Sequence, residues 1–219
     1  MNPVLIYCYD ALCGWCYGFS PVIKKIATEY KDTLHAEVLS GGMILPQRPA
    51  PIGSMSQYIS GAYKRVEELS GITFGQDYLW HIFNPEESDW YLDSLKPAVA
   101  MCVFKEQRPE LQVEFASDLQ YSHLFEGRDL SDNEAYRHLL DRYELSPESF
   151  YQKLADDAYA EKARYEFALV KQLQVNGFPS VMIQTEESKF YMVARGFTPY
   201  ETVKQNIESV LHSITSSSS

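Results

Sequence analysis

Two cysteines separated by two residues, Cys13 and Cys16, form a Cys-Gly-Trp-Cys motif directly after an apolar run at 4–9. The run predicts a strand, and the apolar periodicity that follows predicts a helix over about 14–30. A cysteine at such a helix start lies near unpaired backbone N–H groups and the positive end of the helix dipole, which favour a thiolate. A second thiol one turn later can release whatever the first has captured. This is the chemistry of thiol–disulfide exchange.

A Cys-x-x-Cys pair can also be half of a zinc site, or a structural disulfide. Structural zinc needs two further ligands, usually as a second closely spaced pair. The remaining cysteines, Cys8 and Cys102, are far apart in the sequence, and the five histidines are scattered. A disulfide within the motif would close only a very small loop and add little stability. Redox exchange is therefore the favoured interpretation, and neither a metal nor another cofactor is expected.

The formal net charge of −11 over 219 residues excludes the basic footprint of a nucleic-acid-binding protein. It also argues against adsorption on an anionic membrane, and no apolar run approaches the length of a transmembrane span. The N-terminal stretch has no basic start and no long apolar core of a secretory signal. A cytoplasmic location, where thiols are kept reduced, is therefore expected.

The predicted elements form two matching sets around a long helical stretch. The first set has strands at 4–9 and 34–39 on either side of the helix at 14–30. The stretch between the sets is helical over 44–157. The second set has a helix from about 160 that stops at Asn176 and Gly177, strands at 181–183 and 190–193, and a last helix starting near 198. Residues 46–51, rich in proline, mark the crossing into the helical part. The fold class is thus α/β, with 1–43 and 158–215 as one domain, 44–157 as an all-helical insertion, and 216–219 as a disordered tail.

Two N-cap signals lie inside the expected insertion. One is a capping box at 131–134, and the other is Ser146 followed by a proline at the first helical position. A proline also lies inside the first helix, where Pro21 is expected to cause a kink.

This pattern resembles the thioredoxin fold, and its helical insertion resembles the DsbA branch of that superfamily. The resemblance rests on the strand–Cys-x-x-Cys–helix order, on Pro21 eight residues after Cys13, on the segment 175–179 before a strand, and on the inserted helices. It covers essentially the whole chain. It implies a fold β-α-β, insertion, α-β-β-α, and a thiol–disulfide oxidoreductase acting on protein or peptide thiols and disulfides.

Within that branch the sequence is most similar to cytosolic DsbA-like proteins described as protein disulfide isomerases, on the motif itself and on 39–43. It departs from the family at the dipeptide Gly14-Trp15, where periplasmic oxidases carry Pro-His, thioredoxins Gly-Pro and disulfide isomerases Gly-His. No imidazole is available there to stabilise a thiolate. Reductase or isomerase activity is therefore expected rather than strong oxidation.

The motif residues are assigned separate roles. Cys13, at an exposed helix end, is the expected nucleophile, and Cys16, half-buried below it, resolves the mixed disulfide. Gly14 keeps the approach open to an incoming chain. Trp15 offers an amphipathic surface to an apolar substrate segment, or simply packs against the insertion.

Two further positions follow from the resemblance and from spacing. The resemblance implies a cis peptide bond before Pro179, which would turn the Phe178 backbone towards the dithiol for pairing with a substrate strand. The alternative is an ordinary trans proline at a strand start. Asp10 either relays the proton of Cys16 or, as the favoured alternative, caps the helix or makes a turn.

The remaining candidates have simpler interpretations. Cys8 and Cys102 are expected to be buried small hydrophobic residues. The aromatic residues at 78–91 either line a groove facing the dithiol or, as favoured, pack in the core of the insertion.

Two other functions of the protein remain open. One is a glutathione-dependent isomerase or kappa-type transferase, with glutathione as a partner. The other is a redox-sensing adaptor without turnover.

Overall fold

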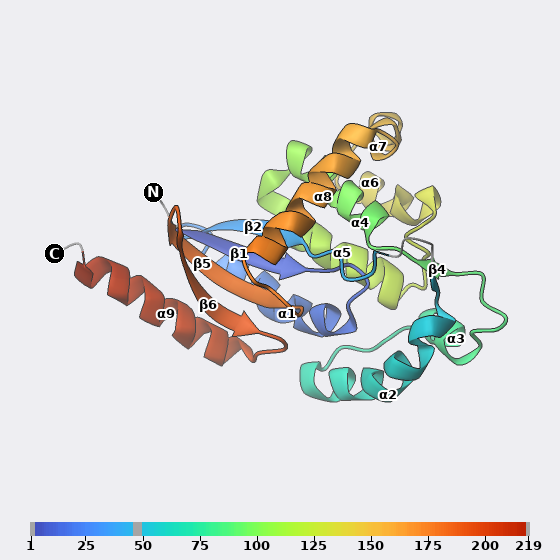
Figure 1. The fold of residues 1–219 in the computed structure, drawn as a ribbon, viewed down its shortest axis with the longest axis horizontal. Coiled ribbons are helices and arrows are strands. Elements are labelled where there is room, and N and C mark those ends of the chain that lie inside the picture. Colours follow the sequence, from blue (N-terminus) through green and yellow to red (C-terminus); the bar gives the residue numbers. More distant parts are fainter. Residues whose placement is uncertain (1–2, 46–49, 218–219) are drawn as a thin grey trace.

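The computed structural model describes residues 3–45 and 50–217, and its helices and strands are shown in Figure 1. The strands are β1 (Val4–Tyr9), β2 (His35–Ser40), β3 (Ala50–Pro51), β4 (Tyr91–Leu92), β5 (Ser180–Glu186) and β6 (Lys189–Arg195). The helices are α1 (Gly14–Glu29), α2 (Gly53–Ser70), α3 (Gln76–Phe83), α4 (Leu95–Gln107), α5 (Gln112–Leu124), α6 (Arg137–Arg142), α7 (Pro147–Leu154), α8 (Asp157–Gln172) and α9 (Tyr200–Ser217), with 3-10 turns at Pro109–Leu111 and Asn133–Tyr136.

The main sheet has the strand order β2-β1-β5-β6. Strands β1 and β2 are parallel, and β5 is antiparallel to both β1 and β6. With α1 between β1 and β2, α8 before β5 and α9 after β6, the order is β-α-β, insertion, α-β-β-α. The predicted fold class is confirmed.

Alternate residues of β1 point to opposite faces of the sheet, as strand geometry requires. Leu5, Tyr7 and Tyr9 belong to a core shared with α1 and α9. Ile6 and Cys8 belong to a smaller core shared with α8. The sheet therefore lies between α1 and α9 on one side and α8 on the other (Figure 1).

Helix α1 contains the predicted internal proline. Pro21 has no N–H to donate to the carbonyl of Tyr17 four residues earlier. The hydroxyl of Ser20 donates to that carbonyl instead, at 2.8 Å. The helix thus continues through the proline with this carbonyl satisfied.

The free edge of β2 is covered by side chains rather than by another strand. The Gln112 side-chain amide accepts from Val38 N at 2.7 Å and donates to the Ala36 carbonyl at 2.8 Å. Further along the same edge, Glu166 accepts from Ser40 N and Lys105 donates to the carbonyl of Val38. Helices α4, α5 and α8 therefore close an edge that would otherwise expose unpaired backbone groups.

The insertion contains one feature that the sequence did not predict. Strands β3 and β4 form a small antiparallel ribbon, with Ala50 opposite Leu92 and Pro51 opposite Tyr91. Two-residue strands are too short to give an alternating hydrophobic pattern. The proline-rich crossing at 46–51 falls partly at 46–49, outside the described residues.

The predicted helix boundaries agree with the structure at one cap and differ from it at two other places. Ser146 caps α7 as predicted, accepting from Ser149 N at 3.4 Å. In the other box the cap is Asp132, not Ser131, because the Ser131 hydroxyl donates to Asp129. Helix α8 ends at Gln172 rather than at Asn176 and Gly177, because Gln174 adopts a left-handed φ of 58°.

The C-terminal end of α9 is also a correction. The helix runs to Ser217, so Ser216, expected in a disordered tail, is helical, and its hydroxyl donates to the His212 carbonyl at 3.0 Å. Residues 218–219 lie outside the described residues.

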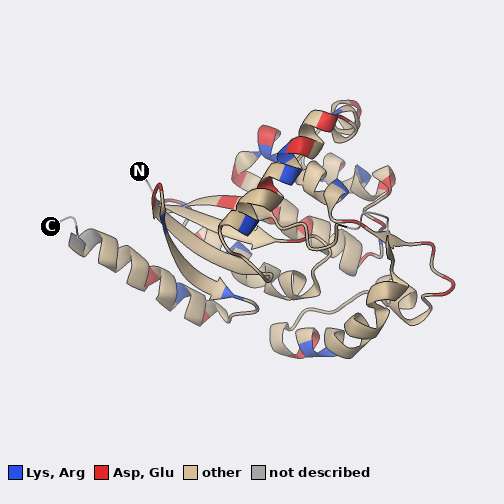
Figure 2. Cartoon of the chain, viewed as in Figure 1, with Lys and Arg blue, Asp and Glu red and all other residues tan. Residues whose placement is uncertain are grey.

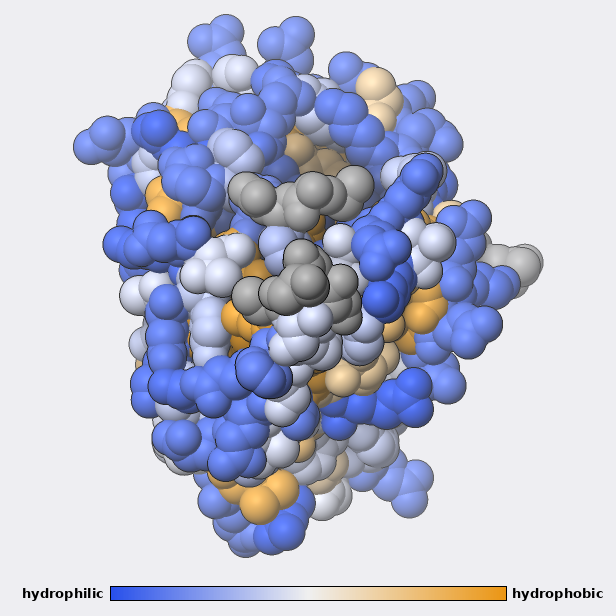
Figure 3. All heavy atoms as spheres, turned by 90° about the vertical axis from the view of Figure 1, so that its left-hand side faces the viewer, coloured by the Kyte–Doolittle hydropathy of each residue, from blue (hydrophilic) through white to orange (hydrophobic). Residues whose placement is uncertain are grey.

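The surface carries charges of both signs, which lie side by side along α8 (Figure 2). The face in Figure 3 is mainly hydrophilic, with apolar residues in small separate areas. Among the helices of the described residues, none has the length and apolar character needed to cross a membrane.

Candidate active site

Cys13 is the N-cap residue of α1, in an extended conformation with φ −84° and ψ 110°. Its Sγ accepts from the backbone N of Cys16 at 3.3 Å. A side chain at this position receives one of the free N–H groups of the helix and lies at the positive end of the helix dipole. Both interactions stabilise negative charge on the capping atom. Both cysteines are free thiols in this structure.

The two sulfurs are less exposed than the sequence predicted. Cys13, expected at an exposed helix end, is only 5% exposed, and Cys16, expected half-buried, is completely buried. The reason is the insertion, which covers this end of α1. Phe74, for example, lies 3.2 Å from the position that a Cβ on Gly14 would take.

Cys13 opens into a cavity of about 80 Å³ whose lining is mostly apolar. Residues 12–15, around the first cysteine, line one side of the cavity, and residues of the insertion line most of the rest. The lining residues are Leu12, Cys13, Gly14, Trp15, Met43, Ile44, Met55, Tyr58, Ile59, Ala62, Tyr63, Val66, Phe74, Tyr78, Leu92 and His123. Trp15 thus both lines the cavity and packs against the core, so its two alternative roles are compatible.

Sequence reasoning missed most of these walls. Helix α2 supplies Met55, Ile59, Tyr63 and Val66, whose three- and four-residue spacing is a signal for one helix face. That signal indicates a buried stripe, but not what the stripe faces. His123, more than a hundred residues after the dithiol, gave no signal at all.

His123 reaches the cavity as a buried, neutral ring. Its Nδ1 donates to the Arg128 carbonyl at 2.9 Å, since a carbonyl can only accept. Burial lowers the pKa of His123, so the imidazole is uncharged at neutral pH. The ring stacks on Trp90 with centroids 5.1 Å apart.

The aromatic residues at 78–91 divide between the two predicted roles. Tyr78 lines the cavity beside Cys13. Trp90 is buried in the insertion, whereas Trp80, Phe83 and Tyr91 are exposed. A continuous aromatic groove from this stretch is therefore wrong, because only Tyr78 faces the cavity.

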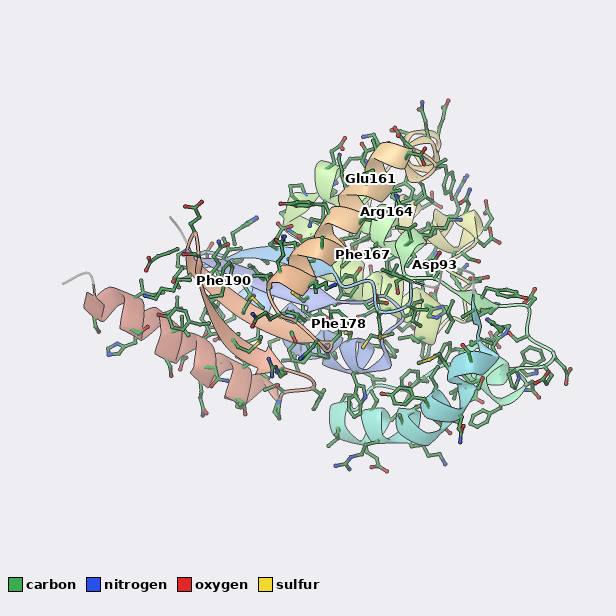
Figure 4. All side chains as sticks on the ribbon, viewed as in Figure 1. Asp93, Glu161, Arg164, Phe167, Phe178 and Phe190 are labelled. Carbon is green, nitrogen blue, oxygen red and sulfur yellow. The ribbon has the colours of Figure 1, made fainter. Side chains whose placement is uncertain are left out.

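The loop before β5 brings a backbone carbonyl to the dithiol. The Phe178 carbonyl oxygen lies 3.8 Å from Cys13 Sγ, and the peptide bond between Phe178 and Pro179 is cis. The Phe178 ring fills the space above Gly41, where a Cβ would come within 2.0 Å of it. Figure 4 shows Phe178 at this end of the sheet, with Phe167 above it on α8.

Asp10 is buried and holds the loops around the dithiol. Its carboxylate accepts from Leu12 N at 3.0 Å, from Met43 N at 2.7 Å and from the Ser94 hydroxyl at 3.0 Å. Burial raises its pKa, and these hydrogen bonds oppose the rise. The contacts are those of the predicted turn cap, extended to the loop after β2 and to the start of α4.

The Cys16 thiol lies in a different environment from that of Cys13. Burial, followed by its interactions with Cys13, raises the pKa of Cys16 well above the ordinary range. Cys16 is therefore a thiol at neutral pH and has to lose its proton when it acts as a nucleophile.

The other cysteines are buried, as predicted. Burial and the negative charge of Glu166 raise the pKa of Cys8 to about 12 and that of Cys102 to about 12. The Cys102 thiol donates to Glu166 at 3.7 Å. Across residues 3–45 and 50–217, no group of three or more His, Cys, Asp or Glu side chains is placed to hold a metal ion.

Residues 4–208 match the DSBA-like thioredoxin domain. The chain belongs to this family. DSBA-like proteins are generally thiol–disulfide oxidoreductases.

Solved structures agree with this membership. A candidate protein disulfide isomerase from Nitrosomonas europaea is 22% identical, with a TM-score of 0.82 over 97% of this chain and 99% of that one. The cytosolic disulfide reductase DsbM from Pseudomonas aeruginosa is 26% identical, with a TM-score of 0.78 over 95% and 98%. A 2-hydroxychromene-2-carboxylate isomerase shares the fold at 11% identity, with a TM-score of 0.61 over 97% and 96%. No curated protein matches the sequence.

Proposed function

We propose that this DSBA-like protein exchanges disulfides with protein or peptide substrates through the dithiol Cys13–Cys16. The observation that carries this proposal is the position of Cys13 Sγ. It accepts an N–H of α1 at 3.3 Å and opens into the apolar cavity. A sulfur so placed can act as the attacking thiolate, and the second thiol three residues later can complete the exchange.

The reaction has two steps. Cys13 Sγ attacks a substrate disulfide, forms a mixed disulfide and releases one substrate thiolate. Cys16 Sγ then attacks Cys13 Sγ, the bond to the substrate breaks, and the second substrate sulfur leaves with the electron pair. The dithiol is oxidised by two electrons, and the substrate disulfide is reduced to two thiols.

The surroundings support roles for the other site residues. The Phe178 carbonyl, 3.8 Å from Cys13 Sγ, lies where a substrate backbone N–H can pair with it, and Pro179 fixes the position of this loop. Trp15 and the α2 face provide apolar contact for the substrate chain. Gly14, which has no Cβ, allows the Phe74 ring to pack close to the dithiol. Asp10 accepts hydrogen bonds from the surrounding loops and holds them in place rather than relaying a proton.

Reduction is the proposed direction in the cell. The dipeptide Gly14-Trp15 provides no imidazole, and the DsbM structure, 26% identical, is that of a cytosolic disulfide reductase. We infer a cytoplasmic location from this likeness. The thioredoxin-like part, 1–43 and 158–215, would carry the sulfurs, and the insertion, 44–157, would carry the substrate walls.

Insulin reduction and refolding of scrambled ribonuclease test the proposal. Wild type should be active in the first assay, and Cys13→Ser should reduce activity to the uncatalysed level. Cys102→Ser, which replaces a thiol outside the site, is the matched control and should retain activity. Equal activity of wild type and Cys13→Ser would contradict the proposal.

Glutathione is a second candidate substrate, because DsbM has also been solved with GSH. Saturable glutathione binding that persists in Cys16→Ser, without insulin reduction by wild type, would favour a glutathione-dependent enzyme. A stable complex with one protein and no turnover in either assay would favour a redox-sensing adaptor.

A further inference from the structure

A tyrosine hydroxyl is buried beneath the dithiol without a hydrogen-bond partner. Tyr7 is in the middle of β1 and is 1% exposed, and its hydroxyl has no partner among the described residues. Leaving such a group unpaired in the interior costs stability.

Strand β1 and helix α1 place Tyr7 and Cys16 in one core. Tyr7 points to the sheet face covered by α1 and shares one core with Cys16 and Phe19. Its ring lies 6.1 Å from that of Phe19, which is three residues after Cys16 and on the same helix face. A second ring contact, with Tyr9 at 5.6 Å, holds it from the side.

The electrostatics of the two groups agree with this placement. Burial is the largest cause of the raised pKa of Tyr7, and the charges of Cys16 and then of Cys13 are the next causes. Other titratable groups near the Cys16 thiol include Cys13, Asp10 and Tyr9. The Asp10 carboxylate already accepts three hydrogen bonds and cannot donate, so Asp10 offers Cys16 only its backbone N–H. Tyr7 thus offers Cys16 an uncommitted O–H donor.

The second exchange step is where such a donor matters. Cys16 must ionise in a buried site when it attacks Cys13 Sγ, and a buried thiolate without a donor is costly. The S–S bond from Cys13 to Cys16 forms, and the bond from Cys13 to the substrate breaks. The proton that leaves Cys16 is balanced by protonation of the departing substrate thiolate.

We propose that the Tyr7 hydroxyl donates a hydrogen bond to Cys16 Sγ as that sulfur becomes a thiolate, making Tyr7 a catalytic residue of the second step. The inference rests on the proposed exchange function. It leaves the first step, the attack by Cys13, independent of Tyr7.

Single-turnover kinetics with a small aromatic disulfide, whose thiolate is coloured, separate the two steps. The first equivalent of thiolate reports the attack by Cys13, and the second reports resolution by Cys16. In Tyr7→Phe the first rate should be unchanged and the second should fall by about tenfold or more, as expected for a lost hydrogen bond to a charged group. Tyr136→Phe is the matched control. It removes another fully buried hydroxyl, bonded to the Leu130 carbonyl at 2.7 Å, and should change neither rate.

A second variant keeps the ring and the hydroxyl. 3-Fluorotyrosine at position 7, introduced by amber suppression, has a more acidic phenol and should accelerate the second step only. If Tyr7→Phe does not fold, the 3-fluorotyrosine protein still tests the role of the Tyr7 hydroxyl.

Three results would overturn the inference. They are an unchanged second rate in Tyr7→Phe, an equal slowing of both steps, or no response to 3-fluorotyrosine. The proposed function fails in a different way, through absence of the first thiolate release in wild type, and the role of Tyr7 would fail with it.

Discussion

The two faces of the sheet carry two cysteine environments with opposite properties. On the α1 face, Cys13 Sγ accepts a helix N–H and opens into a cavity, and the unpartnered Tyr7 hydroxyl lies in the same core as Cys16. On the α8 face, Cys8 and Cys102 lie near the carboxylate of Glu166, which Lys105 and Ser40 N already hold. The difference teaches that the thiol itself does not decide reactivity. Unpaired backbone N–H groups at a helix N-terminus stabilise a thiolate, whereas burial beside a carboxylate destabilises it.

The largest expected effect is a difference in alkylation rate between Cys13 and the two cysteines of the α8 face. With iodoacetamide near neutral pH, Cys13 should react, while Cys8 and Cys102 should remain unmodified in the folded protein. At a pKa of about 12 only about one in 10⁴ or fewer of these thiols is ionised near pH 8. Mass spectrometry of peptides after timed quenching measures the rates. Labelling of Cys102 as fast as Cys13 would remove the contrast between the faces.

The second prediction sharpens the contrast within the dithiol. The pKa of Cys16 is raised, so its thiolate fraction should increase about tenfold per pH unit throughout the range below that pKa. The second thiolate release should therefore accelerate steadily from about pH 6 to about pH 8. Stopped-flow absorbance measures it. A plateau that begins near pH 7 would contradict a raised pKa.

The third prediction concerns stability on the α8 face. Lys105 donates to Glu166 at 2.9 Å, forms an ion pair with Glu37, and donates to the Val38 carbonyl at the edge of β2. Lys105→Met leaves the carboxylate of Glu166 without its cation, so the free energy of unfolding should fall by about 3 kcal/mol. Urea denaturation measures it.

The matched control is Lys162→Met, which removes an exposed ion pair with Glu106 and should have little effect. In the folded fraction of Lys105→Met, Cys13 should alkylate at the wild-type rate. A Lys105→Met protein as stable as wild type would contradict the role of Lys105 in neutralising Glu166. A changed alkylation rate of Cys13 in this variant would show that the two faces of the sheet are not independent.

The smallest expected effect lies in the loop that faces the dithiol. Gly41→Ala places a Cβ within 2.0 Å of the Phe178 ring and should displace the Phe178 carbonyl from Cys13. Insulin reduction should then fall several-fold, with the change mainly in KM. Gly61→Ala on α2, where a Cβ meets nothing within 4 Å, should keep activity and raise thermal stability slightly. An active Gly41→Ala protein would exclude a role for this loop in substrate pairing.

Much of the fold could be predicted because its signals are local. The run at 4–9, the helix after Cys13 and the hairpin of β5 and β6 each follow from periodicity over a few residues. The ribbon of β3 and β4 could not be predicted, because two residues carry no period. The N-cap at Asp132 was missed because the hydroxyl of Ser131 is bonded to Asp129 instead.

The exposure of the site was the main error. A helix start next to a Cys-x-x-Cys motif predicts an accessible sulfur, but Cys13 is 5% exposed because the insertion covers it. The wall residues Tyr63 and His123 are separated from Cys13 by 50 residues or more. No short-range pattern indicates which buried stripe will face the sulfur.

The sequence by itself determined that a sulfur pair lies at a strand–helix junction, because Cys13 and Cys16 are covalent neighbours and one helical turn fixes their separation. Only the tertiary structure decided what surrounds them: the Phe178 carbonyl at Cys13, the Tyr7 side chain in the core that holds Cys16, and the apolar walls from α2. These groups meet the dithiol through packing of distant segments, and each such contact depends on how the whole core fills space.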